Sequence, residues 1–188
     1  MRLRVPSRPV TVDLFRQIPE GPPYYQLIEG NLVIRPSLSF HHQQVLLRIM
    51  CAVGNHVEEE GERGWLIVGP SDVYLDDMNV FEPDLYYVAK ENRRIMVEEG
   101  VRGAPDLVAE ILSPEDCEQD RNEKREVYAR AGVKEMWLID PDVCAIEVHP
   151  LAHGLNVAPE VTRTPAKFAP AMFPGLRIDT AELFKSFA

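Results

Sequence analysis

Residues 106–112 read Asp-Leu-Val-Ala-Glu-Ile-Leu, a nearly continuous apolar run with the length of a β-strand. Alternation along a strand places Glu110 on one face with Val108 and Leu112, and the two residues between them on the other face. Both faces are apolar, as in a central strand that is covered on both sides, and Glu110 interrupts one of them. This stretch therefore predicts a covered sheet with a carboxylate inside it.

A second carboxylate occupies a similar position in residues 81–88, which read Phe-Glu-Pro-Asp-Leu-Tyr-Tyr-Val and are predicted as a strand. Asp84 alternates there with Tyr86 and Val88 on one face. An unpaired carboxylate in such surroundings is costly or takes up a proton, and two close together are worse unless a cation shares them. A hard divalent ion held by two carboxylates and water is one solution. A structural ion pair with an arginine for each carboxylate is the other.

Further helices and strands follow from apolar spacing, capping residues and turn residues. Helices are predicted at 11–17 with Thr11 as cap, at 39–60 with Ser39 as cap, and at 91–98, 113–131 and 180–187. Strands are predicted at 24–29, 32–35, 65–68, 72–75, 81–88, 106–112, 136–140 and 145–148, with Gly30-Asn31 as the turn between the first two. This order predicts an α/β fold with a mixed sheet.

Length and composition predict one soluble domain over residues 1–188. The net charge of −10 disfavours a general nucleic-acid binder, so any role on DNA must depend on a local basic patch or on metal ions. The three cysteines include no C-x-x-C pair, which excludes a zinc ribbon and indicates a reducing cytoplasm. The sequence has no apolar stretch long enough to span a membrane.

A charged segment, residues 120–128, follows the strand that carries Glu110. Asp120, Lys124 and Tyr128 are four residues apart and share one helix face. Taken alone, this pattern favours a solvated helix with supporting ion pairs. Its position directly after the strand allows a different arrangement, in which Lys124 extends toward the carboxylates.

Five stretches resemble the Uma-two family of restriction endonucleases, which belongs to the PD-(D/E)XK nuclease superfamily. The resemblance covers roughly residues 11–150, in order and with compatible gaps, and is carried by residues 25–32, 82–85, 103–114, 120–128 and 131–137. Several long motifs that match together are far more specific than a single Pro-Asp pair. The resemblance implies a restriction-endonuclease-like fold, with a mixed central β-sheet flanked by helices.

The resemblance also implies roles for single residues. Asp84 would be the proline-aspartate metal ligand and Glu110 the strand carboxylate, together binding Mg²⁺ or Mn²⁺. Leu112 stands where the superfamily has its lysine, so Lys124, on the following helix, becomes the candidate for that role. As a helix lysine it is expected to be exposed, so that its replacement costs little stability.

Three further residues are candidate accessory residues. Asp120 could hold the Lys124 ammonium group in place. His42 resembles a first-helix residue that often supplies a polar contact in this superfamily, although a surface histidine fits the sequence as well. Glu29 could be a further ligand, or it could simply end its strand.

The predicted function is a magnesium- or manganese-dependent endonuclease that hydrolyses phosphodiester bonds in DNA. Because a duplex has two strands to cut, a symmetric homodimer is expected. A catalytically silent interaction module that keeps the fold is the alternative, supported by the acidic charge and the displaced lysine. A structural acidic domain, with Asp84 and Glu110 paired to arginines, is the third interpretation.

Overall fold

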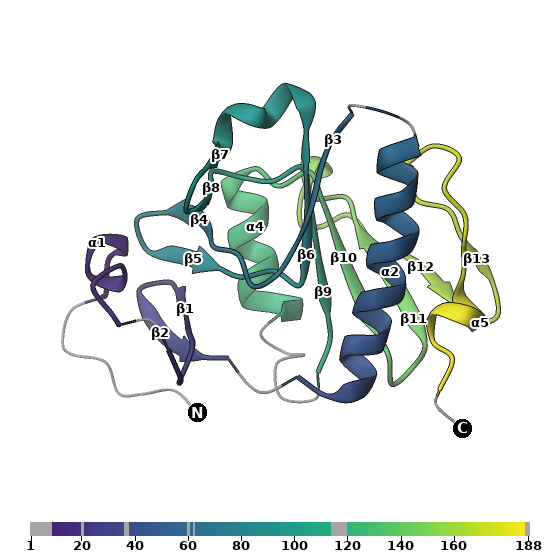
Figure 1. Cartoon of the computed structure of the whole chain (residues 1–188), viewed down its shortest axis with the longest axis horizontal. Helices are drawn as coiled ribbons and strands as arrows, with labels where there is room; N and C mark the ends of the chain where they lie inside the picture. The colour runs from purple at the N-terminus through teal and green to yellow at the C-terminus, as the bar shows by residue number, and fades with distance from the viewer. Residues whose placement is uncertain are drawn as a thin grey trace.

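The computed structural model describes residues 9–19, 21–35, 38–59, 61, 63–113 and 120–186 (Figure 1). Its elements are α1 (Val12–Phe15), β1 (Tyr25–Ile28), β2 (Asn31–Ile34), α2 (Phe40–Glu59), β3 (Gly64–Val68), β4 (Val73–Asp76), β5 (Asn79–Phe81), β6 (Leu85–Ala89), the 3₁₀-helix η1 (Lys90–Ile95), β7 (Met96–Val97), β8 (Gly100–Arg102), β9 (Leu107–Ile111), the π-helix η2 (Asp120–Lys124), α4 (Arg125–Ala131), β10 (Glu135–Asp140), β11 (Ala145–His149), the 3₁₀-helix η3 (Leu151–His153), β12 (Glu160–Arg163), β13 (Lys167–Phe168), β14 (Ile178–Asp179) and α5 (Thr180–Leu183).

A six-stranded central sheet has the order β12-β11-β10-β9-β6-β3. β9 runs parallel to β10 and antiparallel to β6, so the sheet is mixed. Figure 1 shows α2 and α5 on one face of this sheet and α4 on the other. All five residues of β9 are buried. The structure thus confirms a mixed sheet flanked by helices, with the predicted central strand covered on both sides.

A second six-stranded sheet, ordered β2-β1-β5-β4-β8-β7, covers α4 from outside. Val127 and Tyr128 of α4 belong to one buried cluster with Val108 of the central sheet and Phe81 of the second sheet. The rings of Phe81 and Tyr128 meet edge to face, with their centroids 5.1 Å apart. The helix that follows β9 is therefore packed between two sheets through Val127 and Tyr128, while Glu126 and Arg130 stay exposed.

The other face of the central sheet packs against α2. Its buried residues Val45, Ile49, Val53 and Val57 keep helical spacing and join a cluster with the central strands. The predicted cap is present, because the Ser39 hydroxyl accepts a hydrogen bond from the His42 backbone N–H at 3.1 Å. The cap fixes where the helix begins, and so fixes which residues of its first turn face the sheet.

The predicted strand 81–88 is two strands. β5 pairs with β1 and β4 in the second sheet, whereas β6 pairs with β3 and β9 in the central sheet. Pro83 lies in the break between the two strands. Proline has no backbone N–H and cannot donate a hydrogen bond to a neighbouring strand, which favours a break there. Asp84 therefore occupies the crossing between two sheets instead of the middle of a strand.

The first hairpin differs from its prediction by one residue. Ile28 pairs with Asn31, so the turn residues are Glu29 and Gly30, with φ angles of 49° and 73°. A two-residue turn of this kind needs positive φ at both positions. A Cβ atom on Gly30 would lie 2.6 Å from Cβ of Pro9, so packing also favours glycine there.

Candidate active site

Asp84 and Glu110 lie at one end of the central sheet. β6 and β9 pair in a register that matches Leu85 with Ala109, and one further step of this register sets Asp84 opposite Glu110. Figure 1 shows the end of β9 and the beginnings of α2 and α4 at this same end. Residues from four separate segments are therefore brought into one region.

Asp84 is held from both sides. Its Oδ2 accepts a hydrogen bond from the backbone N–H of Ile111 at 2.8 Å and lies 3.1 Å from Nε2 of His42. Its backbone carbonyl accepts from the N–H of Gly69 at 3.0 Å. A Cβ atom at Gly69 would lie 2.7 Å from the carbonyl oxygen of Pro83, so glycine permits this close approach. The carboxylate thus has a fixed position although it lies outside a strand.

Glu110 points toward η2 and α4. Its Oε1 accepts a hydrogen bond from the Tyr128 hydroxyl at 2.7 Å and one from Nζ of Lys124 at 3.2 Å. The pKa of Glu110 is raised to about 8, chiefly by burial and further by the charges of Asp120 and Asp84, against the lowering effects of Lys124 and of the Tyr128 hydrogen bond. The influence of Asp84 means that the two predicted carboxylates interact electrostatically, although the direct contacts of Glu110 are with the helix.

Lys124 is buried, which corrects the expectation of an exposed helix lysine. Its Nζ lies 2.8 Å from Oδ1 of Asp120 and 3.2 Å from Oε1 of Glu110. Burial by itself lowers the pKa of this amine, but the charges of Asp120 and Glu110 outweigh it and hold the pKa above its ordinary value. The ammonium group therefore stays charged between two carboxylates.

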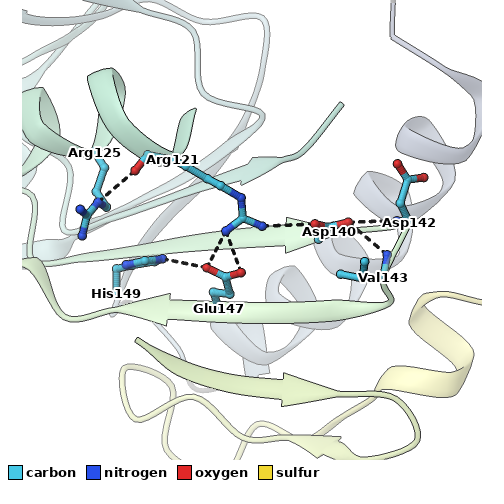
Figure 2. A network of polar contacts seen from close by, with 7 residues as sticks. All are labelled: Arg121, Arg125, Asp140, Asp142, Val143, Glu147 and His149. Atoms are coloured by element: carbon cyan, nitrogen blue, oxygen red, sulfur yellow. Dashed lines mark hydrogen bonds and ion pairs between the residues drawn. The ribbon is translucent and has the colours of Figure 1, made fainter. Parts of the chain in front are cut away.

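The π-helical turn η2 presents both Asp120 and Lys124 to the interior. Such turns are rare and often occur at functional sites. Figure 2 shows how the turn is fastened: Nη1 of Arg121 donates to both carboxylate oxygens of Glu147, at 2.7 and 2.8 Å, and Nη2 donates to Asp140 at 3.2 Å. These carboxylates belong to the hairpin of β10 and β11, so Arg121 ties the turn to the central sheet.

The accessory candidates divide into two groups. Asp120 and His42 belong to the buried cluster, the first through Lys124 and the second through Asp84. Glu29 lies apart, at an exposed position in the turn of the first hairpin, where it accepts a hydrogen bond from Arg130. Sequence reasoning did not single out Arg121, since its partners are 19 and 26 residues away along the chain.

The donor set fits a hard divalent cation. The described hydrogen bonds of Asp84 and Glu110 fall on a single oxygen of each carboxylate. Three buried carboxylates, those of Asp84, Glu110 and Asp120, share the charge of Lys124. Within the described residues, no group of three or more His, Cys, Asp or Glu side chains is arranged to hold a metal. Two carboxylates suffice for Mg²⁺, which usually keeps several waters.

The same architecture occurs in a solved nuclease-like structure. A structure described as "a putative nuclease belonging to DUF820 from Anabaena variabilis" superposes with a TM-score of 0.78 at 22% sequence identity, covering 94% of this chain and 98% of the other. The chain therefore shares the fold of that protein. The profile of the Uma2 family, described as "Putative restriction endonuclease", matches residues 12–181, and the chain belongs to this family. Restriction-endonuclease-like families usually use a divalent metal ion.

No curated protein matches the chain. Among the described residues, no helix is both long and apolar enough to cross a membrane.

Proposed function

We propose that this protein is a divalent-metal-dependent endonuclease that hydrolyses phosphodiester bonds in DNA. The observation that carries the proposal is the buried cluster of Glu110, Lys124 and Asp120 beside Asp84, at the end of a central sheet of the nuclease class. Perturbed titratable groups that converge in this way are typical of active sites. Membership of a restriction-endonuclease family supports the same reaction.

In this proposal Asp84 and Glu110 hold Mg²⁺ or Mn²⁺. The ion supplies Lewis-acid polarisation of the phosphate and lowers the pKa of water. His42 and the Ile111 N–H keep Asp84 Oδ2 in place, which leaves Oδ1 for the ion. Tyr128 holds Oε1 of Glu110 in the same manner. Each ligand is thus oriented by a neighbour, as the supporting shell of a metal site requires.

Lys124 takes the role of the lysine that the strand lacks. Its ammonium group would stabilise the negative charge that develops on the phosphate, or orient the attacking water. Asp120 keeps the amine in position at 2.8 Å, independently of Glu110. The ammonium group of Lys124 can therefore stay in position when the Glu110 carboxylate reorients to bind a metal ion.

The test is cleavage of supercoiled plasmid and of labelled oligonucleotides with Mg²⁺, with Mn²⁺ and with chelator. The wild type should cleave only with metal, and Glu110→Gln should cleave about a thousandfold more slowly. Calorimetry should show weak Mn²⁺ binding that is lost in Glu110→Ala. Cleavage that persists in chelator, or Mn²⁺ binding that is equal in the two proteins, would refute the proposal.

We also propose that the protein is cytoplasmic and acts as a symmetric homodimer, because cutting both strands of a duplex usually needs two active sites. Light scattering at the working concentration of the cleavage assay measures the mass. A monomer that still makes double-strand breaks would remove the homodimer and leave the chemistry intact.

One observation favours a second candidate, the catalytically silent interaction module. Both described contacts of Glu110 are internal, to Lys124 and Tyr128, and they satisfy its Oε1 without a cation. The chain also carries a net charge of −10. If this candidate holds, metal will neither bind nor raise the thermal midpoint, and every nucleic acid tested will remain intact.

A further inference from the structure

The Asp84 carboxylate borders an open cavity. The cavity has a volume of about 330 Å³, and Asp84 lines it together with Tyr24 and Arg35. A second cavity, of about 900 Å³, adjoins it and shares Tyr24, Arg35 and Pro70 in its lining. The second cavity extends from these residues to Phe15 of α1 and is called the Tyr24 hollow below.

The lining of the Tyr24 hollow is unusual for a phosphate site. Aromatic rings contribute much of it, and carboxylates outnumber the arginines: the described lining includes Phe15, Tyr24, Tyr25, Tyr74, Asp72, Glu82, Glu99, Arg16 and Arg35. The three carboxylates and two arginines give the lining a negative balance, which disfavours a phosphate inside the hollow. A nucleobase is uncharged, stacks on aromatic rings and has amino groups that donate to carboxylates. The lining is therefore suited to a base and unsuited to a phosphate.

Arg35 lies where the two cavities meet. It is ion-paired with Glu82, and the two side chains are 18% and 13% exposed. Its guanidinium can contact a phosphate that spans the short path between Asp84 and the Tyr24 hollow, since arginine binds such oxygens through paired N–H groups. The sequence of groups along this path is then carboxylate, arginine and aromatic ring.

The overall charge points to the same kind of substrate. The net charge of −10 produces a negative field that repels the phosphates of a duplex. Binding of a duplex along a broad basic surface is therefore disfavoured. A single unpaired nucleotide needs only a local phosphate contact and a stacking surface. Tyr24 offers such a surface, since the residue is 60% exposed and lines both cavities.

We infer that the Tyr24 hollow receives an unpaired nucleobase next to the phosphate at Asp84, with Tyr24 as the stacking residue and Arg35 as the phosphate contact. The preferred DNA is then single-stranded or carries an unpaired segment at the cut. This inference rests on the proposed function and specifies its substrate class.

The test measures binding of a short single-stranded oligodeoxynucleotide that contains 2-aminopurine, in Ca²⁺ buffer. Wild type should quench the fluorescence of the base, and Tyr24→Phe should preserve the quenching. Tyr24→Ala should abolish it and weaken binding about tenfold. Leu14→Ala is the matched control, because Leu14 is 52% exposed beside Phe15 but does not line the hollow. An oligonucleotide with an abasic site should bind to wild type as weakly as the normal one binds to Tyr24→Ala.

Quenching that survives in Tyr24→Ala, or duplex that binds more tightly than single strand, would overturn the inference. The result is separable from that of the proposed function because it does not require turnover. Quenching that depends on Tyr24, without cleavage in any metal, would support the base-binding site and refute the proposed nuclease function. Cleavage of duplex and abasic DNA at equal rates, unaffected by Tyr24→Ala, would support the proposed nuclease function and refute the base-binding site.

Discussion

Asp106 and Glu110 lie at opposite ends of β9, and each is 3% exposed. The Asp106 carboxylate accepts hydrogen bonds from the Ala89 N–H at 2.8 Å and from Asn92 at 3.2 Å, and lies 2.6 Å from Nζ of Lys134. Burial raises its pKa, but Lys134, the Ala89 N–H and Asn92 outweigh burial and hold the pKa below its ordinary value. Asp106 is thus a buried carboxylate whose charge is fully compensated.

Glu110 is equally buried and has the opposite balance. Its cation, Lys124, is shared with Asp120, and burial raises the pKa of Glu110 to about 8. The comparison teaches that burial alone does not identify a functional carboxylate. What distinguishes Glu110 is that its partners leave its charge only partly compensated, which is the condition in which a divalent cation binds.

The largest expected effect is on cleavage. Glu110→Gln should lower the cleavage rate about a thousandfold, because a metal ligand contributes several kcal/mol of transition-state stabilisation. Asp106→Asn should cleave at nearly the wild-type rate, since Asp106 lies at the other end of the strand. Single-turnover rates on one oligonucleotide measure both. Equal losses of cleavage rate in the two variants would mean that Glu110 and Asp106 do not differ in function.

Lys124→Met should lower the cleavage rate about a hundredfold, as loss of one charged group at a transition state does. Because Lys124 is buried between two carboxylates, the variant should also lose stability. Adding Asp120→Asn should restore part of the stability and none of the activity. Arg125→Ala on the same helix is the control and should be mild. Recovery of activity in the double variant would contradict the role of the lysine.

The two carboxylates should differ in stability as well. Asp106→Ala leaves the buried Ala89 N–H without its acceptor and removes one of the two acceptors of the Asn92 amide, and we expect a loss of about 2 kcal/mol. Glu110→Gln should be neutral or stabilising in metal-free buffer, because it removes the cost of either charging Glu110 beside Asp84 and Asp120 or keeping it protonated. Urea unfolding of both variants provides the values. A stability loss in Glu110→Gln as large as that in Asp106→Ala would assign Glu110 to the structural class.

The smallest effect is a dependence of stability on pH. Between pH 4.5 and about 8 the folded state keeps a proton on Glu110 that the unfolded chain has released. Folding then takes up a proton, so this group lowers stability as pH rises through the window, by at most about 1.4 kcal/mol per pH unit. Asp106, with its lowered pKa, acts oppositely: it contributes stability above its unfolded pKa of 3.8 that is lost as pH falls through its folded pKa.

Unfolding midpoints measured across this pH range should separate the two carboxylates. Glu110→Gln should flatten the decline above pH 4.5, and millimolar Mg²⁺ should do the same in the wild type by displacing the proton. Asp106→Asn should leave that decline unchanged. If neither Glu110→Gln nor Mg²⁺ alters the decline in stability above pH 4.5, that decline is caused by the titration of other groups.

Much of the fold follows from local patterns. The apolar run around Glu110 predicted a covered central strand, and Ser39 predicted where α2 begins, because each depends on neighbours in sequence. The break at Pro83 was within reach of the same reasoning, since proline cannot donate to a ladder. That residues 1–188 form one domain stays a prediction.

The candidate site was less accessible from sequence. Lys124 has the spacing of a solvated helix, and only the second sheet, packed over α4, shows that this helix is buried on two sides. Arg121 finds its carboxylates on a hairpin 19 and 26 residues away, at a distance that no local pattern encodes. Glu29 was predicted to end its strand, and its exposed position inside the turn depends on a turn shifted by one residue.

The position of the lysine has a consequence for how the protein would fail on heating. A lysine at position 112 would be fixed to Glu110 by the pleat of one strand. Lys124 is instead fixed by the docking of η2 and α4, fastened through Arg121 to β10 and β11. Protein segments open in cooperative units of unequal stability. If η2 and α4 undock while the central sheet stays folded, Lys124 leaves the site and activity is lost. Inactivation should therefore occur below the temperature of global unfolding and should reverse on cooling.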